Sequence, residues 1–149
     1  MADPIVLTVE RRIATAPDRV FDAWLDPKSV GRWLFATDGG VMERVEIDPR
    51  VGGGFTILER RGADLAEHHG EYVALDRPGL IAFDFWTSFG EERTRVTIAI
   101  APEGDGSLLT LTHEGVWADW EDKTRQGWTL ILDGLARTLN GDSCQQLSP

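Results

Sequence analysis

The longest helical pattern in the chain lies near its C-terminal end, between residues 120 and 139. On a wheel with about 3.6 residues per turn, one side of this segment is apolar and the opposite side is polar. The apolar side carries Trp120, Trp128, Ile131, Leu132, Leu135 and Leu139. A helix of about 20 residues is about 30 Å long, so it needs an apolar surface as wide as a small domain to pack against.

Short segments with β-branched or alternating residues fill most of the chain before this helix. Residues 5–13 predict a first strand, and two short helices follow, one opening at Pro17 and one over residues 29–35. Further strands are predicted over residues 41–47, 55–61, 69–76, 80–88, 93–101 and 107–115. The glycine-containing segments between these strands are predicted turns or loops, namely residues 48–54, 62–68, 77–79, 89–92 and 102–106.

The predicted order is β-α-α, then six strands, then one helix, which indicates an α+β fold. Strands that follow one another through short turns pair as antiparallel neighbours, so we expect one curved antiparallel sheet packed on the C-terminal helix. Alternation in the central strands places one set of side chains on the face toward that helix. This set is Ile81, Phe83, Phe85, Val96, Ile98, Ile100, Leu109, Leu111 and His113.

Length and charge restrict the class of protein. We expect the 149 residues to form a single domain, with a core over about residues 5–140 and a polar C-terminal tail. The net charge of −10 argues against nucleic acid or an anionic membrane as the main partner, and the pairs Arg11/Arg12 and Arg60/Arg61 are interpreted as solvated strand edges. No apolar run has the length of a membrane-spanning helix, so we expect no membrane insertion. The first residues lack a signal-peptide pattern, and the lone cysteine, Cys144, suits a reducing compartment, so we expect a cytoplasmic protein.

Four stretches of the chain carry a family resemblance: residues 20–33, 48–55, 68–86 and 109–115, the last followed by 127–139. Together they resemble the domain family named for the activator of the Hsp-90 chaperone ATPase. That family belongs to the START-like, helix-grip (SRPBCC) superfamily, which includes the birch-pollen-allergen fold. The resemblance implies a seven-stranded curved sheet that grips the C-terminal helix, with a cavity between them.

His113 is the strongest polar candidate for a role in that cavity, because it shares strand parity with Leu109 and Leu111 and should therefore point inward. An inward imidazole can orient a ligand or exchange protons near neutral pH. It can equally be tied to a backbone carbonyl or a carboxylate and hold the neighbouring loop to the helix.

Other candidate chemistry is weak. His68 and His69 are adjacent on a predicted strand and would point to opposite faces, so we expect no metal site there. The glycines of residues 51–55 lack the lysine and hydroxyl of a phosphate-binding loop, and no nucleophile elbow is present. We therefore predict no catalytic residue and no cofactor.

We expect the chain to bind an apolar small molecule, such as a lipid, a polyketide or an aromatic compound, in the cavity between sheet and helix. The expected ligand-binding residues are Trp33, Phe83, Phe85, Ile98, Leu111, His113, Trp117, Trp120, Trp128, Ile131 and Leu135. Two alternatives remain open: a chaperone-related interaction module of the Hsp-90 ATPase activator type, and a cyclase- or lyase-like enzyme that uses the cavity. A homodimer through the outer sheet face, where Trp86 is expected, is a further possibility.

Overall fold

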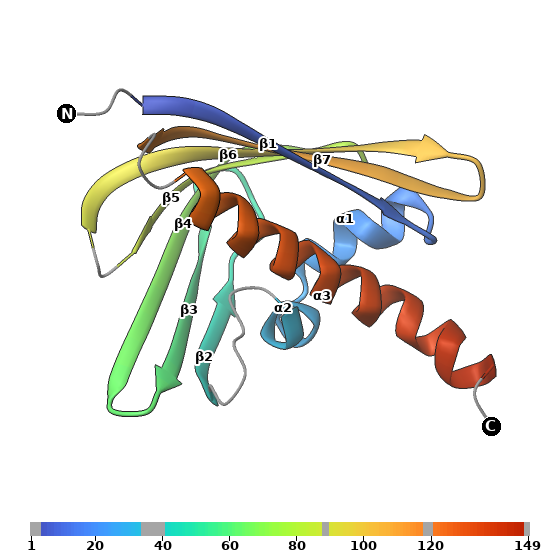
Figure 1. Ribbon diagram of the computed structural model, residues 1–149, viewed down its shortest axis with the longest axis horizontal. Helices are drawn as coiled ribbons and strands as arrows, with labels where there is room; N and C mark the ends of the chain where they lie inside the picture. The colour runs from blue at the N-terminus through green and yellow to red at the C-terminus, as the bar shows by residue number, and fades with distance from the viewer. Residues whose placement is uncertain (1–3, 34–40, 88–89, 118–120, 148–149) are drawn as a thin grey trace.

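The computed structural model describes residues 4–33, 41–87, 90–117 and 121–147. In chain order the elements are β1 (Pro4–Ile13), α1 (Pro17–Leu25), α2 (Pro27–Trp33), β2 (Val41–Ile47), β3 (Gly54–Arg61), β4 (Asp64–Asp76), β5 (Leu80–Thr87), β6 (Gly90–Glu103), β7 (Gly106–Trp117) and α3 (Glu121–Leu147). The seven strands form one antiparallel sheet in the spatial order β1-β7-β6-β5-β4-β3-β2, and the helices lie on its concave side (Figure 1). The predicted α+β helix-grip architecture is confirmed.

Hairpins generate most of this sheet. From β2 to β7 each strand pairs with the next strand along the chain, as expected for strands joined by short turns. β1 instead pairs with β7, which sets Leu7 opposite His113 and brings two distant parts of the chain side by side (Figure 1).

Two predicted loops are shorter than the sequence indicates. The loop expected over residues 62–68 is wrong, because β4 already begins at Asp64 and pairs there with Arg61. Only two residues form this turn, and Gly62 adopts a φ of 63° that favours glycine. β6 likewise begins inside the predicted loop 89–92. In both places the backbone pairing between neighbouring strands continues, because pairing between strands does not require apolar side chains.

The C-terminal helix is longer than predicted. α3 ends at Leu147 and therefore includes most of the segment expected to be a polar tail. Once a helix has started, each added residue forms one more backbone hydrogen bond without needing an apolar partner. The expected start of the helix at Trp120 lies outside the described residues.

The core lies between α3 and the concave face of the sheet. Among the α3 residues whose side chains are described, Trp128, Leu132, Leu135 and Ala136 are buried. The first three belong to the predicted apolar side, whereas the predicted Ile131 and Leu139 are only partly buried. α3 packs most extensively against β1 and against α2. Gly134 permits the contact with α2, because a Cβ at this position would lie 3.2 Å from the Cβ of Trp33.

Glycines and bulges bend the sheet. β2, β3 and β4 run at a steep angle to β1, β6 and β7 (Figure 1). The ring of Phe55 lies over Gly70, where an added Cβ would come within 2.1 Å of the ring. The register shifts between Tyr72 and Ala74 and between Phe85 and Thr87 mark irregularities of the kind that increase strand twist.

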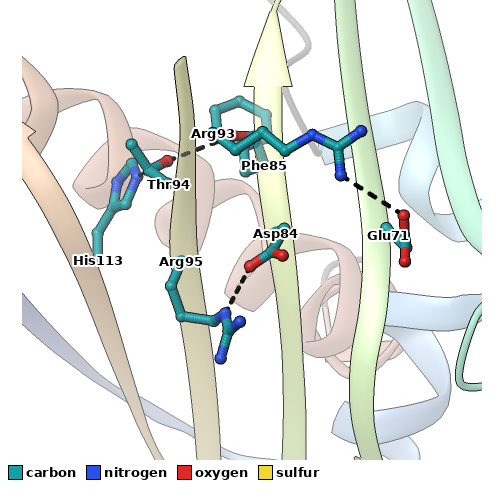
Figure 2. A network of polar contacts seen from close by, with 7 residues as sticks. All are labelled: Glu71, Asp84, Phe85, Arg93, Thr94, Arg95 and His113. Carbon is teal, nitrogen blue, oxygen red and sulfur yellow. Dashed lines mark hydrogen bonds and ion pairs between the residues drawn. The ribbon is translucent and has the colours of Figure 1, made fainter.

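The convex face is polar and carries cross-strand pairs. Arg95 of β6 contacts Asp84 of the neighbouring β5 at 2.6 Å, and Arg93 of β6 reaches across β5 to contact Glu71 of β4 at 3.6 Å (Figure 2). Trp86 also lies on this face, where Arg93 sits 4.0 Å from its ring centroid.

Among residues 4–33, 41–87, 90–117 and 121–147, no cluster of three or more histidine, cysteine or acidic side chains is arranged to hold a metal ion. Among the same residues, no helix combines the length and the apolar character that crossing a membrane requires.

Candidate ligand-binding cavity

A cavity of about 400 Å³ lies between the first half of α3 and the neighbouring strands of the sheet. α3 contributes one wall, and residues of β3, β4, β5 and β7 contribute the other. The lining residues are Arg61, His68, Phe85, Thr87, His113, Thr124, Gly127, Trp128, Leu130 and Ile131.

The helix side of the cavity is mostly apolar. Trp128 is buried and meets Phe85 of β5 edge to face, with ring centroids 6.5 Å apart. Ile131 lies one turn further along α3, while Leu130 is 69% exposed. An exposed leucine that also lines the cavity places an apolar side chain at its opening to solvent.

His113 is held by hydrogen bonds on both ring nitrogens. The indole N–H of Trp128 donates to His113 Nδ1 at 3.0 Å, and His113 Nε2 lies 2.7 Å from the hydroxyl oxygen of Thr94. Indole is a donor only, so Nδ1 must accept and the proton of the neutral ring is on Nε2. The Thr94 hydroxyl therefore accepts from His113 and donates to the carbonyl oxygen of Phe85 at 3.4 Å (Figure 2).

Burial keeps this imidazole neutral. His113 is 6% exposed, and desolvation lowers its pKa to about 4. A neutral ring with both nitrogens engaged has neither a proton nor a lone pair to exchange with a ligand. Of the two roles that the sequence leaves open for His113, the geometry matches the structural one, although its partners are Trp128 and Thr94 rather than a carbonyl or a carboxylate.

The sheet side of the cavity carries polar groups from three strands. Arg61 of β3, His68 of β4 and Thr87 of β5 all line it. The Arg61 Nε–H donates to Glu59 at 2.6 Å, and the Glu59 side chain is only 1% exposed. The interpretation of Arg61 as a solvated edge is therefore wrong, although its neighbour Arg60 is exposed as expected. The signal available in the sequence was strand parity, because Phe55, Ile57, Glu59 and Arg61 alternate along one face.

His68 of β4 lies between Arg61 of β3 and Thr87 of β5 in the cavity wall. Its ring stacks on Phe85 with an interplanar angle of 12° and a centroid distance of 6.1 Å. Burial is the main cause that lowers the pKa of His68 to about 4, and the nearby positive charge of Arg61 lowers it further. His69 points to the opposite face and stacks on Trp86, as expected from alternation.

A second void, deeper in the fold, is nearly filled. Its volume is about 10 Å³, and aromatic rings surround it. Phe83 meets Phe55 edge to face at 5.0 Å, and burial raises the pKa of Tyr72, which lies beside them. Aromatic rings therefore fill most of the space around this second void.

The structure separates the predicted ligand-binding residues into three groups. Phe85, His113, Trp128 and Ile131 line the cavity, and Phe83 lines the small inner void. The buried side chains of Trp33, Ile98, Leu111 and Leu135 belong to the core and do not line it. Trp120 and the side chain of Trp117 lie outside the described residues. Trp33 instead packs edge to face on Trp24 at 4.6 Å and donates to the Ser29 hydroxyl at 3.0 Å.

Comparisons with known proteins agree with this geometry at the level of the fold. A family model described as activator of Hsp90 ATPase homolog 1-like protein matches residues 14–140. The crystal structure of protein CV1439 from Chromobacterium violaceum is 26% identical, with a TM-score of 0.82 over 91% of this chain and 98% of that chain. The Mll3558 protein from Rhizobium loti is 27% identical, with a TM-score of 0.80 over 93% of this chain and 99% of that chain. An AHSA1-like protein from Aeromonas hydrophila shares the fold at 22% identity, with a TM-score of 0.80 over 93% of this chain and 94% of that chain. No curated protein matches the sequence significantly.

Proposed function

The chain belongs to the family of activator of Hsp90 ATPase homolog 1-like proteins, and from that premise we propose that it binds an apolar or aromatic small molecule in the cavity under α3. The observation that carries this proposal is the cavity itself. Its volume of about 400 Å³ falls within the range of roughly 300–1,000 Å³ that is typical of small-molecule sites. Trp128, Phe85 and Ile131 provide the apolar walls that such ligands require.

The size of the cavity supports a binding role over imperfect packing. Protein interiors are packed as densely as organic crystals, and voids larger than a water molecule are few. The void of about 10 Å³ beside Phe83 represents ordinary packing in this same core. The cavity of about 400 Å³ opens to solvent beside Leu130, so its apolar walls face water there, and a ligand would replace that water with dispersion contacts.

Binding without catalysis fits the polar groups better than the cyclase or lyase alternative. That alternative depends on His113 as an acid or base, and both nitrogens of its ring are engaged by Trp128 and Thr94. The alternative of a chaperone-related interaction module rests on the family description alone. Ligand binding in the cavity is therefore the function that the geometry favours.

Gly127 offers a direct test of this function. It lies on α3 at the cavity wall, and a Cβ added there would meet no heavy atom within 4 Å. A Gly127→Leu substitution should place its side chain in the space that the ligand needs. It should also favour the helix, because glycine destabilises a helix interior by about 1 kcal/mol relative to good helix formers.

The measurement is a titration with N-phenyl-1-naphthylamine, a neutral aromatic probe whose emission rises in apolar surroundings. The parent chain should bind it, and Gly127→Leu should weaken binding about tenfold or more, which corresponds to about 1.4 kcal/mol. Gly127→Ala is the matched control, which shares the gain in helix stability but leaves most of the cavity open. A parent chain that does not bind the probe, or a leucine variant that binds it equally well, would contradict the proposal.

A further inference from the structure

The ionisable groups that the structure describes in the cavity wall are either paired or neutral. Arg61 is ion-paired at 2.6 Å with the buried carboxylate of Glu59 and has a further interaction partner besides it. Burial lowers the pKa of His68 and that of His113 to about 4, so both imidazoles are neutral near pH 7. A charged head group in this space would lose its water without gaining a counter-charge, which is costly for either sign.

Most polar groups of the lining already have partners within the protein. Both ring nitrogens of His113 are engaged, one by the indole of Trp128 and the other by the hydroxyl of Thr94. His68 and Thr87 each have an interaction partner as well. A ligand that depended on these groups would therefore have to displace contacts that the fold already makes.

Thr124 differs from the other polar residues of the lining. It lies on α3, is partly buried and lines the cavity. Within the described part of the chain, its hydroxyl forms no hydrogen bond. A hydroxyl supplies one donor and two acceptor sites without any charge. Because residues four apart share a helix face, this hydroxyl lies beside the apolar wall that Trp128 provides.

We propose that the ligand is uncharged, that a hydroxyl or carbonyl group of it hydrogen-bonds the Thr124 hydroxyl, and that its apolar body lies against Trp128 and Phe85. This inference rests on the proposed function and narrows it to a ligand class and to one residue that determines specificity. Six residues of helix separate Thr124 from the exposed Leu130, a distance of roughly 9 Å along α3. The polar end of the ligand therefore lies away from the opening beside Leu130, where a charge could have stayed hydrated.

Four compounds that share one butylphenyl body test the preference for charge. They are butylbenzene, 4-butylphenol, 4-butylbenzoate and 4-butylbenzylamine, titrated at pH 7.5 with displacement of N-phenyl-1-naphthylamine as the readout. At this pH the phenol is neutral, the benzoate is an anion and the amine is a cation. 4-Butylphenol should bind at least about tenfold more tightly than either charged compound, because neither charge finds an unpaired partner in the lining.

The variant that removes the polar contact is Thr124→Val, which keeps the branched shape of the side chain but not its hydroxyl. 4-Butylphenol should bind it about threefold or more weakly than the parent chain, the loss expected for one hydrogen bond. Butylbenzene has no polar group, so its affinity should not fall. Thr124→Ser restores a hydroxyl and should recover the affinity for 4-butylphenol.

Thr138→Val is the matched control for this substitution. Thr138 also lies on α3 but does not line the cavity. The change in side chain is identical, so any effect on helix stability is shared while the cavity stays intact. All four affinities should equal those of the parent chain.

The outcomes distinguish this inference from the binding function. If either charged compound binds the parent chain as tightly as 4-butylphenol, the inference is overturned while apolar binding stands. The same conclusion follows if Thr124→Val leaves the affinity for 4-butylphenol unchanged or weakens butylbenzene equally. If the parent chain binds none of the four compounds, the proposed function itself fails.

Circular dichroism checks that each variant is folded. Should Thr124→Val be unfolded, Thr124→Ala replaces it, since alanine favours a helix and also lacks the hydroxyl. 4-Butylphenol should again bind about threefold or more weakly. An unaltered affinity in that variant would overturn the inference.

Discussion

The indole Nε1 of Trp128 lies 3.0 Å from Nδ1 of His113, and this buried hydrogen bond joins α3 to β7 at the wall of the cavity. The two rings also meet nearly at right angles, with centroids 5.8 Å apart. α3 makes few other contacts with β7, so this pair helps to define the distance between helix and sheet. When no ligand fills the cavity, a fixed contact of this kind between α3 and the sheet is needed to keep its two walls apart.

Removal of the indole donor should destabilise the fold. A Trp128→Phe substitution leaves Nδ1 of His113 without its donor and also removes part of the ring. We expect it to lower the free energy of unfolding by about 1–2 kcal/mol more than the loss of ring volume alone, because a buried acceptor without a partner keeps its desolvation cost. Urea denaturation followed by far-ultraviolet circular dichroism measures this difference.

Trp24→Phe provides the control for ring volume. Trp24 is buried to the same extent as Trp128, but its Nε1 has no hydrogen-bond partner among the described residues. Both substitutions remove the same atoms, so the difference between them isolates the hydrogen bond. Equal losses in the two variants would show that the bond to His113 contributes nothing to stability.

Acidification should destabilise the protein before its carboxylates titrate. The pKa of His113 and that of His68 are lowered from 6.5 to about 4 in the folded state, chiefly by burial. Below pH 6.5 the unfolded chain therefore binds more protons than the folded chain. Stability is fully present above pH 6.5 and is lost progressively as the pH falls toward 4. At pH 5 the loss should be on the order of 2 kcal/mol for each histidine.

Histidine variants identify the source of this pH dependence. Urea denaturation at pH 7.5 and at pH 5 should show the largest fall in the parent chain. His113→Gln and His68→Gln should each be less stable at pH 7.5, yet each should lose less on acidification. His69→Gln is the control, because His69 lies on the convex face beside Trp86. Identical pH dependence in all four proteins would rule out the buried imidazoles as its cause.

A methyl group at Gly70 should strain the bent part of the sheet. The ring of Phe55 occupies the place of the missing side chain, and an alanine Cβ would approach it to 2.1 Å. Phe55 cannot move freely because it packs edge to face on Phe83. Gly70→Ala should therefore lower the free energy of unfolding by about 1–3 kcal/mol, as overpacking does in other cores.

Gly79→Ala is the comparison for that substitution. Its nearest contact, the carbonyl oxygen of Ile100, would lie at an ordinary distance of 3.5 Å. Thermal denaturation should show a clear decrease in the midpoint for Gly70→Ala and almost none for Gly79→Ala. A tolerated alanine at position 70 would mean that Phe55 has room to move and that the inner void is larger than it looks.

The ion pair between Arg77 and Asp22 should matter little for stability. Two parallel hydrogen bonds of 2.9 Å join the β4–β5 turn to α1, and the hydrogen bond from Arg77 lowers the pKa of Asp22. Both side chains are more than half exposed, so solvent screens the pair. A double-mutant cycle with Asp22→Asn and Arg77→Gln should therefore give only a small coupling energy, which salt weakens further. Whatever the pair does contribute is present above the ordinary aspartate pKa of about 4 and should be lost as the pH falls from there through the lowered pKa of Asp22.

Much of the architecture could be predicted from local patterns. Alternation placed Phe83, Phe85 and His113 on the face toward α3, because successive residues of a strand point to opposite sides. The apolar side of α3 was predicted correctly for Trp128, Leu132 and Leu135 because helical periodicity depends only on spacing. Strand ends were predicted less well. β4 begins at Asp64, within a polar stretch, since backbone pairing with β3 needs no apolar side chains.

The cavity depends on distances that no local pattern contains. Trp33 and Leu135 have the same apolar character as Trp128, yet the close approach of α2 and α3 at Gly134 places those two in the core. Strand parity already puts Arg61 on the same face as Phe55, but only the meeting of β3 and α3 makes that face part of a cavity wall. The role of His113 likewise depends on a partner from another element, because only the meeting of α3 and β7 brings an indole N–H to its ring.

Periodicity therefore determined which face of each strand and helix is apolar, since that property belongs to neighbours along the chain. Whether two apolar faces touch or leave a gap was settled by the curvature of the sheet and by the size of the side chains between them. Those quantities arise only when segments far apart in the chain, such as β3 and α3, come together. A space of about 400 Å³ lined by residues of both β3 and α3 is a product of that assembly.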